Sequence, residues 1–166
     1  MVLTINIMNH LSSKRDDQLL EVQATKLQNL LNEILHCCED RRFYEAQRFG
    51  LPYAEIRCLL LFKGERYLTV KGIAQKLDVA KSRITKLIDG LLRKGMVERM
   101  EDPRDARVKL ISLTNKGIEK VKKIEEFHKD VHKQILLRLD HQERKAILSR
   151  LEVLKLAMES VRSELG

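Results

Sequence analysis

The chain has 166 residues, 43% hydrophobic and 34% charged, and its 32 Lys and Arg outnumber 24 Asp and Glu, which gives a net charge of +8. This length suits one compact domain, or one small domain framed by helices, and the scarcity of Pro, Gly and aromatic residues disfavours a barrel or sandwich. The longest apolar run, Cys58 to Phe62, is far shorter than the roughly 20 residues of a membrane span, so we expect no membrane partner.

A long helix is predicted near the N-terminus. The first residues, MVLTINIMNHL, have no basic residue ahead of a long apolar core, so we expect no secretory signal and a cytoplasmic protein. Asp16 and Asp17 offer a helix start. Behind them apolar residues recur at alternating steps of four and three, which is a heptad seam formed by Leu20, Ala24, Leu27, Leu31, Ile34 and Cys38. We assign residues 12–50 to an N-terminal dimerisation helix.

The three cysteines are Cys37, Cys38 and Cys58. They are too few for a disulfide framework, and a reducing cytoplasm keeps them as thiols. We expect them to be packing residues, because free cysteine behaves as a small hydrophobe. A redox switch is the alternative.

Three short helices are predicted in the middle of the chain. Pro52 suits the first turn of one helix and Gly64 its end. Thr69 caps the next helix, VKGIAQKL, and after a turn at Asp78 and Val79 the third, AKSRITKLIDGLLRKG, ends at Gly95. The residues at core spacing are Ile56, Leu59, Leu60, Val70, Ile73, Ala74, Leu77, Ile84, Leu87, Ile88 and Leu91. The last two helices form a helix-turn-helix unit, whose second helix would lie in a DNA major groove.

Positive charge is concentrated in this part of the chain. Residues 71–120 carry thirteen Lys and Arg against seven Asp and Glu, a balance of +6, which is the pattern expected for a phosphate-backbone partner. The exposed residues at the start of the third helix offer hydrogen-bond donors to phosphates and base edges, and we predict that DNA is contacted by Lys81, Ser82, Arg83, Thr85 and Lys86.

A β-hairpin is predicted after Gly95, because short apolar alternations at residues 97–101 and 107–113 flank the charged turn DPRDA. A hairpin in this position is the wing of a winged helix. Pro103 stiffens the turn. At its tip we predict that Arg104 enters the minor groove, that Arg107 is a second contact, and that Asp102 and Asp105 position these arginines.

A long helix is predicted after Thr114, with an apolar stripe formed by Ile118, Val121, Ile124, Phe127, Val131, Ile135 and Leu139. One side of it carries Glu125, His128 and His132, and the two histidines have the i, i+4 spacing that zinc can use. His36 and Cys37 of the first helix could complete such a shell. We nevertheless expect no metal and no cofactor, with the histidines partly buried or interfacial.

A final helix is predicted from a D-x-x-E start at Asp140 and Glu143, which resembles a capping box. Its seam, Ile147, Leu151, Leu154, Met158, Val161 and Leu165, repeats the rhythm of the first helix. Residues 114–166 would complete the dimerisation region. We expect the two seams to pack across a homodimer, with pairing inside one chain as the alternative. The residues assigned to dimerisation are Leu20, Leu27, Leu31, Ile147, Leu151, Leu154, Met158 and Val161.

Two segments resemble the MarR family of bacterial transcriptional regulators: IAQKLDVAKSRITKLIDGLLRKGMVER, residues 73–99, and DPRDARVKLISLTNKG, residues 102–117. The resemblance implies a triangular homodimer with winged lobes, a pseudo-palindromic DNA site, and an effector pocket between the dimer helices and the lobe. Ala80 departs from the pattern, because the family usually has Ser or Thr at this position.

The predicted fold is mainly α with a small β-hairpin wing: a winged helix-turn-helix domain at residues 51–113, framed by long terminal dimerisation helices. No G-x-S-x-G motif, glycine-rich phosphate loop or paired carboxylates occur in a plausible cleft, so we expect no enzyme. We expect a sequence-specific DNA-binding transcriptional regulator that responds to a small molecule or to stress. We expect it to act as a repressor rather than as an activator. The alternative is a winged-helix module that contacts only proteins.

Overall fold

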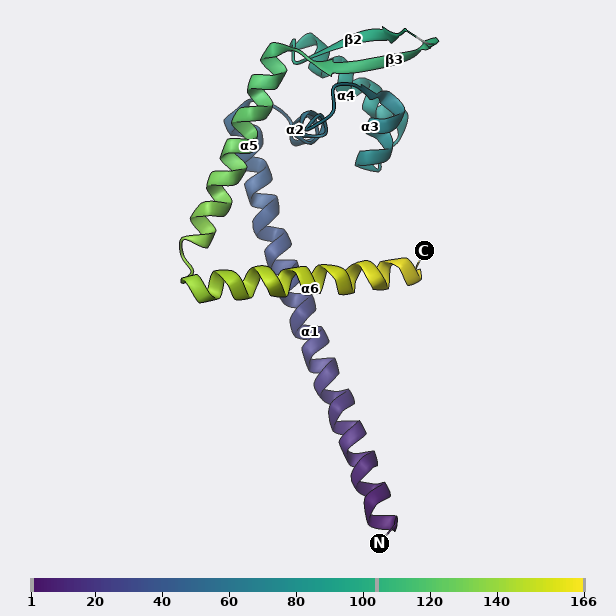
Figure 1. Cartoon of the computed structure of the whole chain (residues 1–166), viewed down its shortest axis with the longest axis vertical. Helices are drawn as coiled ribbons and strands as arrows, with labels where there is room; N and C mark the ends of the chain where they lie inside the picture. The colour runs from purple at the N-terminus through teal and green to yellow at the C-terminus, as the bar shows by residue number, and fades with distance from the viewer. Residues whose placement is uncertain (1, 104, 166) are drawn as a thin grey trace. The chain divides into compact units, whose positions relative to one another are not determined.

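The computed structural model of the chain describes residues 2–103 and 105–165, and the side chains of residues 16–103, 105 and 107–165 (Figure 1). The chain divides into two units, Met1–Glu55 and Ile56–Gly166.

The first unit is dominated by one helix, α1, which spans Val2–Phe49. The predicted start at Asp16 and Asp17 is wrong, because no Pro or Gly interrupts the preceding residues and the helix continues through them. The helix ends at Gly50, which has a φ of 62° and whose N–H donates to the Gln47 carbonyl. The end of α1 is therefore set by a left-handed glycine.

Most of the predicted seam of α1 is exposed. Leu20, Leu27 and Ile34 are 64%, 42% and 55% exposed, whereas Leu31 and Cys38 are half-buried. Among the cysteines, Cys58 is buried, as a packing role requires, but Cys37 is exposed. The apolar stripe of α1 therefore lies open along much of the helix in the single chain.

The second unit begins with three short helices that share one core. They are α2 (Tyr53–Leu60, whose first turn belongs to the first unit), α3 (Val70–Leu77) and α4 (Lys81–Arg93). Thr69 caps α3 by accepting a hydrogen bond from the Gly72 N–H at 3.0 Å, and Asp78, with a φ of 53°, makes the tight turn before α4. The fully buried apolar side chains include Ile56, Leu59, Ile73, Ile84, Ile88, Leu91, Ile111 and Ile124. The capped helix, the tight turn and the shared buried side chains confirm the predicted helix-turn-helix unit.

The wing is a hairpin of β2 (Val97–Asp102) and β3 (Asp105–Leu113), and in Figure 1 it projects beyond the three short helices. Val97 pairs with Leu113 at its base, and the register shifts between Glu101 and Asp102 near its tip. A strand that the sequence analysis missed, β1 (Leu68–Thr69), pairs with the other edge of β3 to give the antiparallel order β1-β3-β2. Two residues are too short for a period of two to be recognised. We call residues 56–113 the winged lobe.

Two longer helices follow, α5 (Asn115–Leu136) and α6 (His141–Leu165). The predicted capping box is confirmed, because Asp140 Oδ1 accepts from the Glu143 N–H and the Asp140 N–H donates to Glu143 Oε2, both at 2.8 Å. Leu139 lies beyond the end of α5. The predicted seam residues Ile147, Leu151, Met158 and Val161 are exposed and Leu154 is half-buried. In the described part of the chain, no helix is apolar enough over a sufficient length to span a membrane.

The first turn of α5 is bonded to the chain that leaves α4. Thr114 Oγ1 donates to the Gly95 carbonyl at 2.7 Å, and Lys116 Nζ donates to the Lys94 carbonyl at 2.8 Å. Gly117 approaches so closely that a Cβ atom added there would lie 2.0 Å from the Met96 carbonyl oxygen. Residues 114–117 therefore hold the start of α5 against the end of α4.

Candidate nucleic-acid interface

The start of α4 presents one polar face. Because Ile84, Ile88 and Leu91 repeat at helical spacing and are fully buried, the opposite side of the helix is turned outward. That exposed side carries all five residues that the sequence analysis assigned to DNA, Lys81, Ser82, Arg83, Thr85 and Lys86. Ala80, at the N-cap, makes no side-chain cap bond. The structure thus brings the predicted helix residues together on one accessible surface.

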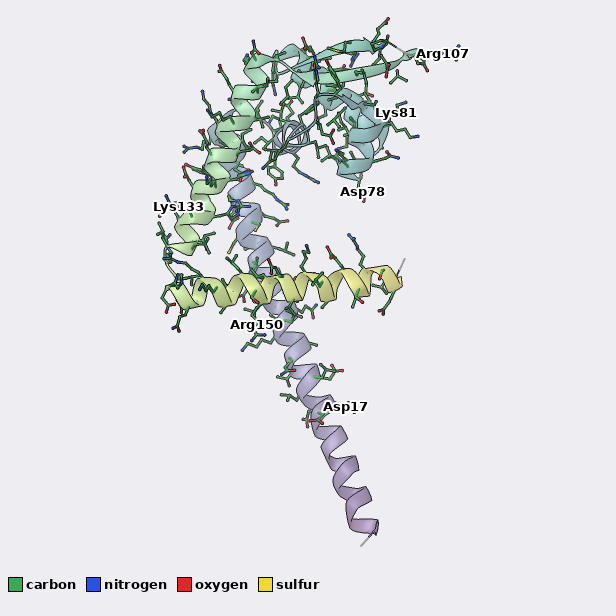
Figure 2. All side chains as sticks on the ribbon, viewed as in Figure 1. Asp17, Asp78, Lys81, Arg107, Lys133 and Arg150 are labelled. Atoms are coloured by element: carbon green, nitrogen blue, oxygen red, sulfur yellow. The ribbon has the colours of Figure 1, made fainter. Side chains whose placement is uncertain are left out.

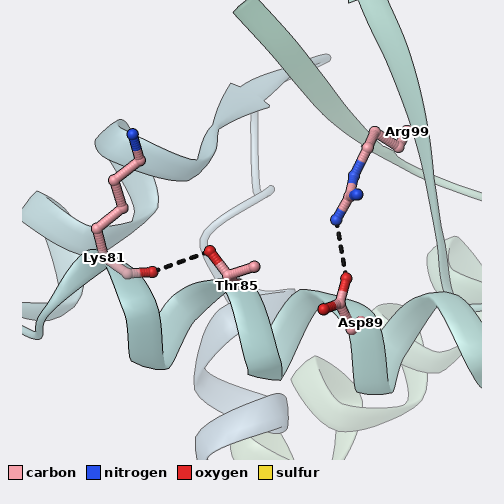
Figure 3. Close-up of polar contacts among 4 residues, drawn as sticks. All are labelled: Lys81, Thr85, Asp89 and Arg99. Carbon is pink, nitrogen blue, oxygen red and sulfur yellow. Dashed lines mark hydrogen bonds and ion pairs between the residues drawn. The ribbon is translucent and has the colours of Figure 1, made fainter.

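Thr85 differs in its chemistry from what the sequence analysis expected. Its Oγ1 donates a hydrogen bond to the Lys81 carbonyl at 3.1 Å (Figure 3). The hydroxyl proton is therefore used within the helix. Thr85 offers a ligand an acceptor oxygen and a methyl group, and not the predicted donor.

A hollow of about 350 Å³ lies beside this face and is lined by basic residues from three elements. Lys71 comes from the first turn of α3, Lys81 from the start of α4, and Arg107 and Lys109 from β3. Figure 2 shows Lys81 and Arg107 projecting from neighbouring parts of the winged lobe. We call this hollow, which also includes Thr69, Val70 and Val108, the basic cleft.

Lys71 and Lys109, which line this site, were not predicted to belong to it. Lys109 could have been found, because it lies two residues after Arg107 and so shares a face of the strand with it. Lys71 carried a weaker signal, a cation in the first turn after the Thr69 cap. Lys71, Lys81 and Arg107 line one hollow together with Lys109, which is ion-paired with Glu101. Cations gathered in this way suit a polyanion.

The tip of the wing is organised partly through the backbone. Asp105 Oδ1 accepts a hydrogen bond from the Arg107 N–H at 2.9 Å, so the contact of Asp105 is with the main chain of Arg107. Arg104, the predicted minor-groove residue, lies outside the described residues. On the adjoining strands Lys109 forms an ion pair with Glu101. The hydrogen bond from Lys109 and its charge lower the pKa of the Glu101 carboxyl.

The candidate zinc ligands of α5 do not come together as a metal site. Glu125 Oε1 forms an ion pair with Lys63 Nζ at 3.1 Å, His128 is half-buried and His132 is exposed. Among the side chains that the structure describes, those of residues 16–103, 105 and 107–165, no three His, Cys, Asp or Glu form a group that could hold a metal ion.

A second hollow, of about 510 Å³, lies between α5 and the winged lobe. Its lining mixes apolar side chains with charged and polar ones, including Ser112, whose Oγ donates to Glu98 Oε1 at 2.9 Å. The residues that line it are residues 62–67, Glu98, Ser112, Leu113, Ile118, Val121, Lys122 and Glu125. We call it the α5 hollow. Its volume lies within the range of small-molecule sites, about 300–1,000 Å³.

Comparison with known proteins finds a family match and several related regulators. Residues 49–108 match the sequence profile of the MarR family. The transcriptional regulator AdcR of Streptococcus pneumoniae is 37% identical over 57 residues, which cover 34% of this chain and 39% of that protein. YfiV, an uncharacterised HTH-type transcriptional regulator of Bacillus subtilis, is 28% identical over 72% of this chain and 75% of its own length. The repressor MdtR of B. subtilis is 29% identical over 63% of this chain and 64% of its own length.

Solved structures share the fold over a larger part of the chain. MepR, a transcription regulator of the Staphylococcus aureus multidrug efflux pump MepA, superposes with a TM-score of 0.68 at 20% identity, covering 78% of this chain and 96% of that one. A mutant of S. aureus MepR bound to an oligodeoxyribonucleotide gives a TM-score of 0.60 at 21% identity, covering 79% and 96%. These structures have a winged lobe with flanking helices, as this chain does.

Proposed function

We propose that this chain, whose residues 49–108 match the MarR family, is a DNA-binding transcriptional regulator, and specifically a repressor that binds a pseudo-palindromic operator as a homodimer. The observation that carries the proposal is the continuity of the basic cleft with the exposed face of α4, since Lys81 belongs to both. A duplex needs both features: base readers in a groove and cations along the backbone.

In this proposal α4 enters the major groove and the wing lies over the adjacent minor groove. Arg83 reads a base edge and Lys86 meets a phosphate. The basic cleft takes the phosphates of the strand that runs between the two grooves. Arg104 and Arg107 of the wing reach the minor groove, where narrow A·T-rich tracts attract arginine. A neighbour of similar fold, the MepR mutant with its oligodeoxyribonucleotide, is DNA-bound, which supports this use of the fold.

Homodimerisation is supported by the exposed seams of α1 and α6. Large apolar side chains such as Leu20 and Leu151, which are 64% and 49% exposed, are unfavourable in water over such long stretches. A second copy would cover them, and its α4 would then reach the second half-site of a pseudo-palindrome.

Ligand response is assigned to the α5 hollow. This hollow lies between α5 and the winged lobe, so a molecule bound there can change the angle between the helix and the lobe. Because Thr114 and Lys116 bond the start of α5 to the end of α4, such a change would reach the recognition helix. A ligand acts only by its difference in affinity for the DNA-binding and released conformations.

The proposed DNA binding is tested with duplexes that the protein selects from a random-sequence pool, measured by mobility shift. Arg83→Ala should lose roughly 1 to 3 kcal/mol of binding free energy and relax the preference at one base pair. Lys86→Ala should weaken binding to all sequences alike. If the wild type selects no duplex at physiological salt, the protein-contact module becomes the better proposal.

The ligand proposal is tested by screening small molecules for release of the selected duplex. Ile118 is 54% exposed and lines the hollow, so Ile118→Trp should fill it without disturbing the core. We expect this variant to bind DNA normally and to ignore any compound that releases the wild type. Release that is unchanged in Ile118→Trp would place the effector elsewhere.

A further inference from the structure

One ion pair links the recognition helix to the wing. Arg99 Nη2 of β2 lies 2.9 Å from Asp89 Oδ1 of α4 (Figure 3). Resting on the proposed DNA binding, we propose that Asp89 and Arg99 are positioning residues, which set the angle of the wing so that its arginines and α4 engage one duplex together.

Asp89 occupies an unfavourable place for an acid. Lys81, Thr85 and Asp89 are spaced by four residues, so they follow one another along the same side of α4. A carboxylate that continues a DNA-facing stripe repels phosphates unless a cation neutralises it. Arg99 supplies that cation from the wing. We therefore expect Asp89 to have a structural role whose benefit exceeds its repulsion of DNA.

This role is not the stabilisation of the fold by the ion pair between Asp89 and Arg99. The side chains of Arg99 and Asp89 are 38% and 44% exposed, and ion pairs this open to water add little to folding. The base of the wing is already held by apolar packing, since Met96, Val97 and Ile111 are all buried. What the pair adds is a side-chain attachment of β2 to α4 at the outer end of this buried base, where Arg99 pairs with Ile111.

Because the tip of the wing lies far from its base, a small rotation at the base displaces the tip by a large distance. The attachment of β2 to α4 therefore affects the position of the tip. Five residue steps lead from Val97 to Asp102, which is about 16 Å at the rise of a strand. A rotation of about 10° at the base would therefore move the tip by about 3 Å, the full length of a hydrogen bond. A contact between Arg107 and DNA depends on excluding such rotations.

The sign of one substitution separates positioning from simple electrostatics. Asp89→Ala removes a negative charge from the DNA-facing side and also favours helix, because alanine has the higher helix propensity. If charge alone matters, this variant binds DNA more tightly than the wild type. If the pair positions the wing, it binds more weakly in spite of the gain in charge.

The experiment measures affinity for the duplex that the wild type selects from a random pool, and for the same duplex with scrambled flanks. The variants are Asp89→Ala, Arg99→Ala and the reversed pair Asp89→Arg with Arg99→Asp. The matched control is Asp78→Asn, which also removes one carboxylate from the helix-turn-helix unit. Asn tolerates the left-handed φ of 53° at that position. Thermal melting of each variant checks folding.

We expect Asp89→Ala and Arg99→Ala each to lose about fivefold or more in affinity for the selected duplex, the loss of one groove contact. Both should lose the preference for intact flanks, and the reversed pair should restore it. Asp78→Asn should bind at least as tightly as the wild type. Tighter binding by Asp89→Ala, or a reversed pair no better than Arg99→Ala, overturns the inference while leaving DNA binding intact. A wild type that selects no duplex overturns the proposed function as well.

Discussion

Gly117→Ala is the substitution whose effect follows most directly from the structure. Its counterpart is Gly72→Ala, because each glycine is the third helical residue behind a threonine cap. The Gly117 N–H donates to Thr114 Oγ1 at 3.1 Å, and the Gly72 N–H donates to Thr69 Oγ1 at 3.0 Å. The two sites differ in what a methyl group would meet. At Gly117 it lies 2.0 Å from the Met96 carbonyl oxygen, and at Gly72 it lies 3.3 Å from the Thr69 hydroxyl.

These distances determine how much stability each substitution should cost. Alanine in a helix is favoured over glycine by about 1 kcal/mol, which both variants gain in part. Ordinary contact begins near 3.4 Å, so α5 must move by more than an ångström at Gly117. Such a shift breaks the bonds of Thr114 to the Gly95 and Met96 carbonyls, at about 1 kcal/mol each, or leaves an overpacked contact of similar cost. We expect Gly117→Ala to be destabilised by about 2 kcal/mol relative to Gly72→Ala.

The assay is urea unfolding followed by far-ultraviolet circular dichroism. All variants are compared at one protein concentration, because self-association would otherwise change their apparent stability. Gly72→Ala should unfold at or slightly above the urea midpoint of the wild type, and Gly117→Ala well below it. Equal midpoints for the two variants would refute the close approach of α5 to residue 96.

Three further results are expected. Lys71→Ala should weaken binding to all duplexes and reduce the slope of log affinity against log salt by about 1 if Lys71 meets a phosphate; an unchanged slope would remove it from the interface. Leu151→Asp combined with Leu154→Asp should dissociate or unfold the proposed homodimer in sedimentation at micromolar concentration, whereas a stable monomer that still binds DNA would contradict the proposal of a dimer. Since the pKa of Glu101 is lowered from 4.5 by Lys109, the pair stabilises the wing above that pH and is lost as the pH falls through the lowered value. Nuclear magnetic resonance titration of the carboxyl should give a midpoint below 4.5 that rises in Lys109→Ala, and an identical midpoint in both would exclude the pair in solution.

Much of the winged lobe could be predicted from the sequence, because its signals are local. The spacing of Ile84, Ile88 and Leu91 defines a buried side of α4, and the opposite side is then exposed without further information. Asp140 and Glu143 form their capping box within a single turn. The alternation on both sides of residues 102–105 predicts the two strands of the wing. Each of these depends on residues a few positions apart.

Local sequence patterns did not predict the start of α1, where no residue interrupts the helix, or the strand β1, which is too short to show alternation. Asp16 and Asp17 are acceptable helix starters, but a starter does not end the helix that precedes it, so α1 continues from Val2. The two-residue strand β1 exists because β3 offers it an edge, with Leu68 opposite Ile111. Its own sequence shows no alternation. Whether residues 68–69 form a strand is therefore determined by their pairing with β3 and not by their own sequence.

The arrangement of the candidate site was decided only by tertiary packing. Lys71 and Lys109 are far apart in sequence and line one cleft because α3 and β3 are brought together by β1 pairing and a common core. Asp89 and Arg99 come within 2.9 Å because α4 and β2 diverge from the turn at Gly95 at a particular angle. The sequence determines which residues are charged and which side of each element they occupy. Which of those charges meet depends on the angles between elements, and these are set by how side chains interlock in the core.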